Sequence, residues 1–185
     1  MHFLKLLIPT LLILILSGCM SGQYYVLSNA STPSKTYAYK SERIGVEKVT
    51  VPEYLFKREL AVAKSSSQVV FLSDATWAED LNAGLTQRLI SFLQKKFNQP
   101  HVYAYPWGTD KQPSKKVKVT ISRFIAQGNR VYLDANWEVE NLSTGRSKAR
   151  LFSTTVATSS DAKSIVSSMD RAFGELEEVV ARGVR

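Results

Sequence analysis

The reactive side chain that stands out in this sequence is the thiol of Cys19, which directly follows Leu16, Ser17 and Gly18. It is the only cysteine among the 185 residues, so the chain can form no internal disulfide. A thiol can act as a nucleophile or bind a metal, and its surroundings decide which chemistry applies. Here two small residues precede it, as they do at the cleavage site of an exported protein.

An apolar segment leads up to this thiol. Lys5 supplies a positive charge, and the eleven positions 6–16 are almost entirely apolar, although Pro9 lies among them. A membrane-spanning helix needs roughly 20 apolar residues, so this run is too short to span. A basic start, an apolar middle and a small-residue end together predict a signal peptide over residues 1–18.

The end of this segment also resembles the lipobox of bacterial lipoproteins, in which Leu, two small residues and Cys follow one another. The resemblance implies cleavage before Cys19 and acylation of its thiol and new amino terminus, with palmitate among the chains. Two or more acyl chains hold a protein firmly at a membrane. The alternative is an ordinary secreted protein with a stray cysteine, which the position of Cys19 at the end of the apolar run disfavours. In lipoprotein sorting an Asp after the cysteine retains the protein at the inner membrane; this chain has Met20, which predicts the outer membrane.

Little else in the sequence suggests catalysis. Of the two histidines, His2 leaves with the predicted signal and His101 stands alone beside Pro100. No Cys/His cluster has the spacing of a metal site, the run Ser65–Ser67 lacks a nucleophile-elbow pattern, and no glycine-rich phosphate loop is present. We therefore predict no catalytic residues, no metal, no cofactor and no enzyme activity.

The charge balance is basic. The whole chain has 24 basic and 16 acidic residues, and the predicted signal contains only Lys5, so the exported part carries a net charge of +7. Export separates the protein from nucleic acid, which leaves anionic lipid or an acidic protein as charged partners. The basic residues are scattered along the chain, however, and solubility alone is the favoured explanation.

Hydrophobic periodicity predicts two long helices. The first covers about 77–97, with Thr76 and Glu79 spaced as a capping box and apolar residues at three- and four-residue steps. The second covers about 161–182, with Ser159 or Ser160 as its N-cap.

Strand patterns occupy most of the remaining chain. They predict short strands at 24–27, 44–51 and 101–105, a hairpin of 60–63 with 68–72, and a three-stranded meander over about 117–157. The fold class is therefore α+β, with a mixed, largely antiparallel sheet and both helices packed on one face. Residues 19–185 have the size of a single domain.

The order of several short motifs along this chain resembles that of the PqiC family of ABC-type transport auxiliary lipoproteins. These motifs are Tyr24-Tyr25-x-Leu27, Ile44-Gly45-Val46, Val51-Pro52-x-Tyr54-Leu55, Trp77-Ala78-Glu79-x-Leu81, Pro106-Trp107, Arg123-Phe124 and Ala135-x-Trp137. The resemblance covers about residues 24–182. It departs after Leu55, where many members have an Asp-Arg-Pro-Gln-like run and this chain has Phe56-Lys57-Arg58-Glu59.

The resemblance implies a non-enzymatic lipoprotein on the periplasmic face of the outer membrane. It would dock and tether a mammalian-cell-entry (MCE) domain protein that works with an ABC permease in lipid transport between the membranes. The alternative is a lipoprotein of another envelope process, such as regulation of cell-wall synthesis or lipopolysaccharide export. The Trp-Ala-Glu motif and the absence of a long polar stalk after Cys19 favour the first.

The predicted partner interface combines a connector with two edge tryptophans. The connector is apolar and basic, and comprises Tyr54, Leu55, Phe56, Lys57 and Arg58. Trp77 and Trp107 are further candidates, since tryptophan often anchors interfaces, although sealing the end of a core is the favoured role for both. MCE proteins generally form rings, as the resemblance implies, so self-association through the connector and the sheet edges is also predicted.

Overall fold

The computed structural model describes residues 22–27, 29, 31–38 and 41–185. The predicted signal peptide (1–18), including Leu16, Ser17 and Gly18, and the predicted lipid-attachment residue Cys19 lie outside this part, so both stay predictions. Within the described part, no helix combines the length and the apolar character needed to cross a membrane.

Eight strands, two α-helices and two short 3-10 helices make up the described chain. In chain order they are β1 (Gln23–Tyr25), β2 (Ile44–Val46), η1 (Glu53–Phe56), β3 (Glu59–Ala63), β4 (Val69–Trp77), α2 (Leu81–Lys96), β5 (Val102–Ala104), η2 (Thr109–Lys111), β6 (Lys115–Gln127), β7 (Arg130–Asn141), β8 (Ser147–Ala157) and α3 (Ala162–Val184).

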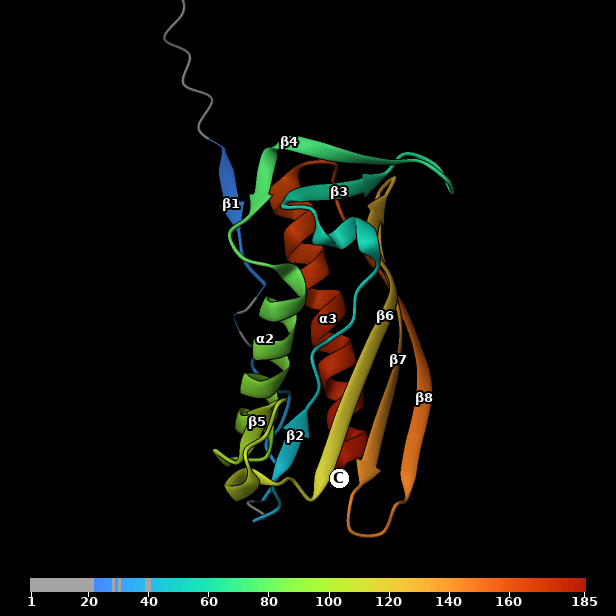
Figure 1. Cartoon of the computed structure of the whole chain (residues 1–185). Coiled ribbons are helices and arrows are strands. Elements are labelled where there is room, and N and C mark those ends of the chain that lie inside the picture. Colours follow the sequence, from blue (N-terminus) through green and yellow to red (C-terminus); the bar gives the residue numbers. More distant parts are fainter. Residues whose placement is uncertain (1–21, 28, 30, 39–40) are drawn as a thin grey trace, which may run out of the picture.

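All the described strands belong to one sheet that branches at β6 (Figure 1). One edge of β6 pairs with β2 near its start and with β3 near its end, and a bridge between Thr50 and Thr120 lies between them. Its other edge pairs along its whole length with β7, and β7 then pairs with β8. The long meander β6–β7–β8 therefore forms one side of the molecule, and strands β1 to β5 complete the other.

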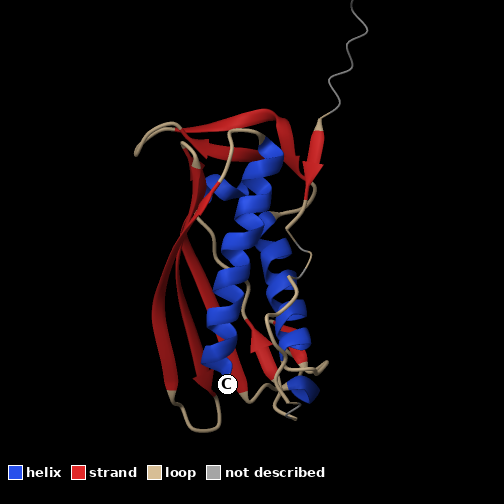
Figure 2. Ribbon diagram, turned by 180° about the vertical axis from the view of Figure 1, so that it is seen from behind, coloured by secondary structure: helices blue, strands red, loops and turns tan. Residues whose placement is uncertain are grey.

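The two helices lie side by side against the same face of the curled sheet (Figure 2). Helix α3 packs on the meander, and its whole predicted apolar stripe is buried there: Ile165, Val166, Met169, Ala172, Phe173, Leu176 and Val180. Helix α2 packs beside α3 and against β5. We refer to the opposite face of the meander as the convex face.

The predicted α+β class, with two long helices on one face of a mixed sheet, is confirmed. The sheet contains more parallel pairing than a largely antiparallel arrangement implies. The pairs β1–β4, β2–β5, β2–β6 and β3–β6 are parallel, whereas only β3–β4, β6–β7 and β7–β8 are antiparallel among the described residues. Strands from distant parts of the chain produce the parallel pairs, and local sequence patterns do not encode such pairings.

The predicted start of the first helix is wrong. Strand β4 continues to Trp77, because its end pairs with β1 and the Trp77 N–H donates to the Arg58 carbonyl at 2.7 Å. Helix α2 begins only at Leu81, so Thr76 and Glu79 form no capping box. The second helix begins as predicted, but Asp161 caps it in place of Ser159 or Ser160, with its side chain accepting from the Ser164 N–H.

Candidate functional site

The predicted connector is divided between the core and the surface. Leu55 is only 3% exposed, and the Tyr54 hydroxyl accepts a hydrogen bond of 3.1 Å from the Phe124 N–H. Burial raises the pKa of Tyr54 above its usual value. Phe56 is 53% exposed, and Lys57 and Arg58 are also exposed, so these three residues are the part of the connector that a partner can reach.

Trp77 is a core residue and is not available to a partner. It is 2% exposed and lies at the end of β4, where Arg58 Nε donates to its carbonyl at 3.0 Å. Of the two roles weighed for this tryptophan, sealing the core therefore applies. The arginine of the connector is held against the backbone of β4 by this bond and by a second one to the Ala78 carbonyl.

Trp107 is half-buried and lies away from the connector, beside β2 and β5. Its Nε1 donates to the Tyr103 carbonyl at 3.1 Å, and its ring makes an edge contact with Tyr105. The ring also covers Gly45, where any Cβ would overlap with it. The structure therefore joins Phe56–Arg58 with Trp77 at one end of the sheet but does not bring Trp107 to the same place.

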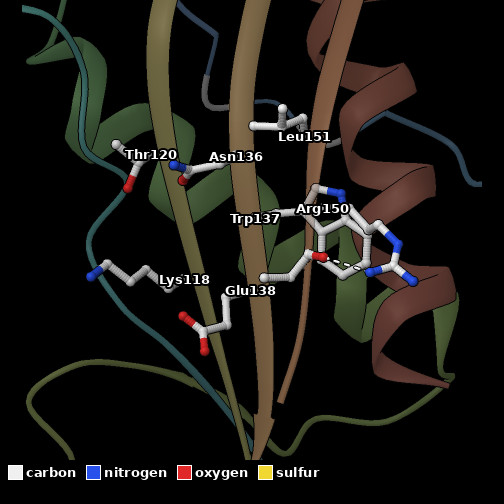
Figure 3. A pocket seen from close by; sticks show the side chains of 8 residues that line it. Lys118, Thr120, Asn136, Trp137, Glu138, Arg150 and Leu151 are labelled. Atoms are coloured by element: carbon white, nitrogen blue, oxygen red, sulfur yellow. Dashed lines mark hydrogen bonds between the residues drawn. The ribbon is translucent and has the colours of Figure 1, made fainter.

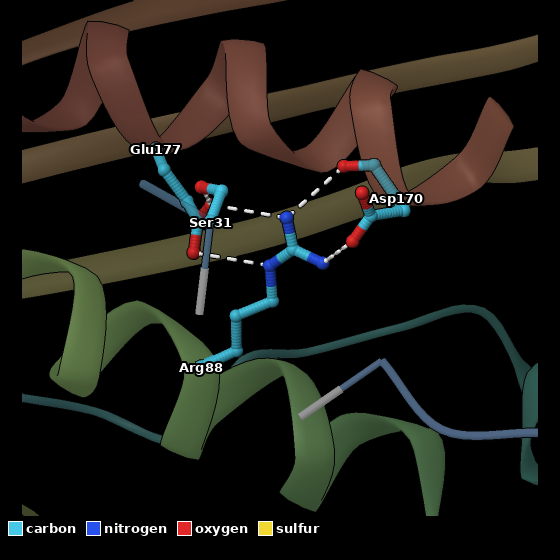
Figure 4. A network of polar contacts seen from close by, with 4 residues as sticks. All are labelled: Ser31, Arg88, Asp170 and Glu177. Carbon is cyan, nitrogen blue, oxygen red and sulfur yellow. Dashed lines mark hydrogen bonds and ion pairs between the residues drawn. The ribbon is translucent and has the colours of Figure 1, made fainter. Parts of the chain in front are cut away.

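A buried ionic cluster, which sequence reasoning missed, joins α2 to α3 (Figure 4). Arg88 of α2 is fully buried and donates from Nε to Glu177 of α3 at 3.2 Å. The other two guanidinium nitrogens of Arg88 donate to the Asp170 carboxylate and to the Asp170 backbone carbonyl. Ser31, which precedes β2, donates to the remaining oxygen of Glu177 at 2.6 Å.

The ionisation of Glu177 is opposed by its surroundings. Burial raises the pKa of this carboxyl to about 7, although Arg88 and Ser31 act in the opposite direction. A raised pKa in a concave site is one mark of a catalytic acid or base. Here the carboxyl is enclosed between two helices and every oxygen has a protein partner, so the cluster acts as a link within the fold.

A second ionic link joins the same two helices about two turns further along α2, to the residue that follows Glu177 in α3. Lys96 of α2 is buried, and its Nζ lies 2.6 Å from a carboxylate oxygen of Glu178. The other oxygen of Glu178 accepts from the Ser34 N–H at 2.7 Å, and the Tyr37 N–H donates to the Lys96 carbonyl. We call residues 31–38 the strap (Ser31 to Ala38), because these bonds and that of Ser31 hold it across the helix pair.

No cluster of three or more potential metal ligands occurs among the described residues. His101 lies beside Tyr103, with Nδ1 2.8 Å from the tyrosine oxygen.

The convex face of the meander is polar and open. A shallow hollow of about 430 Å³ lies on it, bordered by Lys118 of β6, Asn136 and Glu138 of β7, and Leu151 of β8 (Figure 3). Leu151 is 88% exposed, more than any other large apolar side chain of the described chain. The hollow is too open to enclose a small ligand, so this face offers a surface and not a binding cavity.

The sequence pattern of a known family matches most of this chain. The family is described as the ABC-type transport auxiliary lipoprotein component, and its pattern matches residues 25–181. This chain belongs to that family. The sequence-based prediction of a PqiC-type auxiliary lipoprotein is thereby confirmed. The match runs from the end of β1 into the last turn of α3.

Named relatives agree with this membership. The chain is 26% identical over 140 residues to "Intermembrane transport lipoprotein PqiC" of Escherichia coli (strain K12), which covers 72% of this chain and 73% of the relative. The protein of the same name from Shigella flexneri matches with the same identity and coverage.

Solved structures share the fold of this auxiliary lipoprotein. Protein XCC0632 from Xanthomonas campestris superposes with a TM-score of 0.74 at 15% identity, over 88% of this chain and 94% of that one. An uncharacterized protein gives a TM-score of 0.68 at 22% identity, over 82% and 100% of the two chains. At these identities the likeness concerns the fold alone.

Proposed function

We propose that this protein is the outer-membrane lipoprotein of an intermembrane lipid transport system, in which it docks and tethers an MCE-domain partner that works with an ABC permease. The observation that carries the proposal is the family match over residues 25–181, behind a Leu16-Ser17-Gly18-Cys19 motif. The names of the two relatives, which describe them as intermembrane transport lipoproteins, support the same role.

The proposed anchor is a set of acyl chains, palmitate among them, on Cys19 after removal of residues 1–18. Only three residues separate Cys19 from β1, so the tether between membrane and domain would be short. Each residue spans at most about 3.6 Å, which keeps the β1 end of the domain close to the membrane. Met20 in the position after the cysteine supports the outer membrane.

The proposed role is that of a docking component and not an enzyme. The enclosed position of Glu177 and the open convex face support this, because neither offers a site where a reaction could be shielded from water. Self-association is part of the proposal, since a ring of copies would engage each subunit of a ring-shaped partner. Phe56, Lys57 and Arg58 are the exposed connector residues for these contacts.

Four measurements test the proposal. Mass spectrometry of the mature amino terminus should find acylated Cys19, and Cys19→Ser should release a folded protein from the membrane fraction. The wild type should band with outer-membrane markers on a density gradient and should co-purify with an MCE-domain protein. An unmodified Cys19 would overturn the anchor, and a wild type that retains no MCE protein would overturn the docking role.

Light scattering on the detergent-solubilised lipoprotein, alone and with the MCE protein, measures the proposed self-association. A mass above that of one copy is expected, and a strict monomer in both samples would overturn the proposed self-association.

A further inference from the structure

The unpaired edge of β8 is unusually open at its first half. Among the described strands β8 pairs with β7 only, so its other edge presents free backbone N–H and C=O groups. Residues 147–151 are all exposed, on both faces of the strand. Natural proteins usually cover or shorten such edges, because any extended chain can pair with them. A bare edge on an eleven-residue strand is therefore a potential docking site.

The side chains of this half-strand fall into two rows. Lys148 and Arg150 lie opposite Val139 and Trp137, which are buried on the helix side of β7. Residues directly opposite in an antiparallel pair share a face, so both cations stand at the rim of the helix side. The alternate row, on the convex face, contains Ala149 and Leu151 next to the hollow (Figure 3).

The cations of this edge have no acidic partner among the described residues. No ion pair in that part of the chain involves Lys148 or Arg150, and the Arg150 guanidinium donates there to the neighbouring Ala149 carbonyl. Further along the strand the charge changes, because Glu175 of α3 accepts from the Thr154 hydroxyl at 2.5 Å. Lys148 and Arg150 are the only charged residues of β8 itself, so the cations that this strand offers both lie in its first half.

We propose that the first half of β8 receives an extended acidic segment of a partner protein, which pairs with the free edge as an additional strand. In this arrangement the backbone supplies affinity and the alternating side chains supply specificity. The segment would place acidic residues beside Lys148 and Arg150, and apolar residues beside Ala149 and Leu151. The inference deepens the proposed docking role and rests on it, since it names the surface and the chemistry of the partner.

Two other occupants fit the observations less well. Pairing of two β8 edges through this half would bring cations of both copies together, which is unfavourable. An anionic membrane surface would also attract Lys148 and Arg150, but β1, the strand nearest the proposed anchor, lies at the opposite end of the molecule from the start of β8 (Figure 1). The twelve residues of β7 alone span about 40 Å, so the two ends are well separated.

The test uses the full-length product in detergent and a fluorescent peptide of about eight residues in which Glu and Val alternate. The matched probe has Lys in place of Glu. The test variant is Lys148→Glu/Arg150→Glu, and the control is Lys64→Glu/Lys163→Glu, which makes the same charge change at two exposed lysines elsewhere. Fluorescence anisotropy measures binding, and hydrogen exchange locates it.

We expect the wild type to bind the Glu/Val peptide and to gain exchange protection at residues 147–151. The test variant should bind it roughly tenfold more weakly, as the loss of two exposed charge pairs implies, and should prefer the Lys/Val peptide. The control variant should behave as the wild type.

Three results would overturn the inference. The peptide could protect the connector instead of β8. Protection of β8 could depend only on protein concentration, which would indicate a second copy, or could be produced by phosphatidylglycerol vesicles alone, which would indicate a membrane surface. Equal binding by test and control variants would overturn it as well. Co-purification separates the two proposals. If the wild type and the test variant both retain the MCE protein, the edge is not the docking surface although docking stands. If the wild type retains none, the docking role fails.

Discussion

Two regions of the molecule carry basic side chains in opposite environments. One is the contact between α2 and α3, which we call the seam, and the other is the first half of β8. In the seam, Arg88 and Lys96 are buried and each meets a carboxylate of α3. On β8, Lys148 and Arg150 are exposed and make no ion pair among the described residues.

The difference follows from the cost of removing a charge from water. A buried cation that loses its partner is strongly destabilising, so the seam must contain its own carboxylates. An exposed cation stays hydrated and needs none. Charges in the seam are therefore paired within the fold, whereas charges on the β8 edge remain available to something outside the chain.

The largest effect is expected for Arg88→Met, which keeps much of the side-chain volume but leaves Glu177 without its buried cation. Breaking a buried pair from one side costs about 3–5 kcal/mol in the free energy of unfolding. Urea denaturation followed by circular dichroism measures it. Arg150→Met is the matched control and should change this free energy by less than about 0.5 kcal/mol. Similar losses in both variants would contradict the contrast.

Glu177→Gln should change how stability depends on pH. The native pKa of Glu177, about 7, lies above the usual 4.5, so the native state holds its proton more tightly than the unfolded state. The contribution of this group is therefore fully present below pH 4.5 and is lost as the pH rises to about 7, a fall of up to about 3 kcal/mol. The variant lacks this titration, so its stability relative to wild type should rise between pH 4.5 and 8. A wild type that gains relative stability over that range would show that the ion pair with Arg88 outweighs burial.

Glu178→Gln should show the opposite pH dependence. Burial opposes ionisation of Glu178, but the bonds from Lys96 and the Ser34 N–H outweigh it and hold its pKa below the usual value. Its contribution is thus present above pH 4.5 and is lost as the pH falls below that value. At pH 7 the variant should lose about 1–2 kcal/mol, because Lys96 stays buried without an anionic partner. Its strap amides should also exchange faster. A difference from wild type that persists undiminished at pH 3 would exclude this explanation.

The smallest effect on stability is expected for Lys148→Ala/Arg150→Ala. Both side chains are exposed, so the free energy of unfolding should change by less than about 0.5 kcal/mol per residue. Binding of the Glu/Val peptide should nevertheless weaken, as for the charge-reversed pair. If the variant lost stability but still bound the peptide, Lys148 and Arg150 would be stabilising the fold, as is expected of Arg88 and Lys96, and would not be binding a partner.

Local patterns in the sequence determined most of the elements. The alternation of apolar residues on 117–121 and 131–139 predicted β6 and β7, and the apolar stripe from Ile165 to Val180 predicted the buried face of α3. These features depend on period and burial, which a sequence displays directly. The motif order also predicted the family, because it spans the chain. Of the seven predicted interface residues, Leu55 and Trp77 are core residues, which the sequence pattern alone did not show.

Only the tertiary structure decided which charges pair and which remain free. Arg88 and Glu177 are 89 residues apart in the chain. Each falls at helical spacing among buried apolar residues of its own helix, but the sequence does not show that the two side chains face each other. Likewise, the extension of β4 to Trp77 depends on pairing with β1, and this long-range contact overrides the capping-box pattern at Thr76 and Glu79. Charge pairing and strand order depend on distances between remote segments, and those distances exist only once the helices have packed on the sheet.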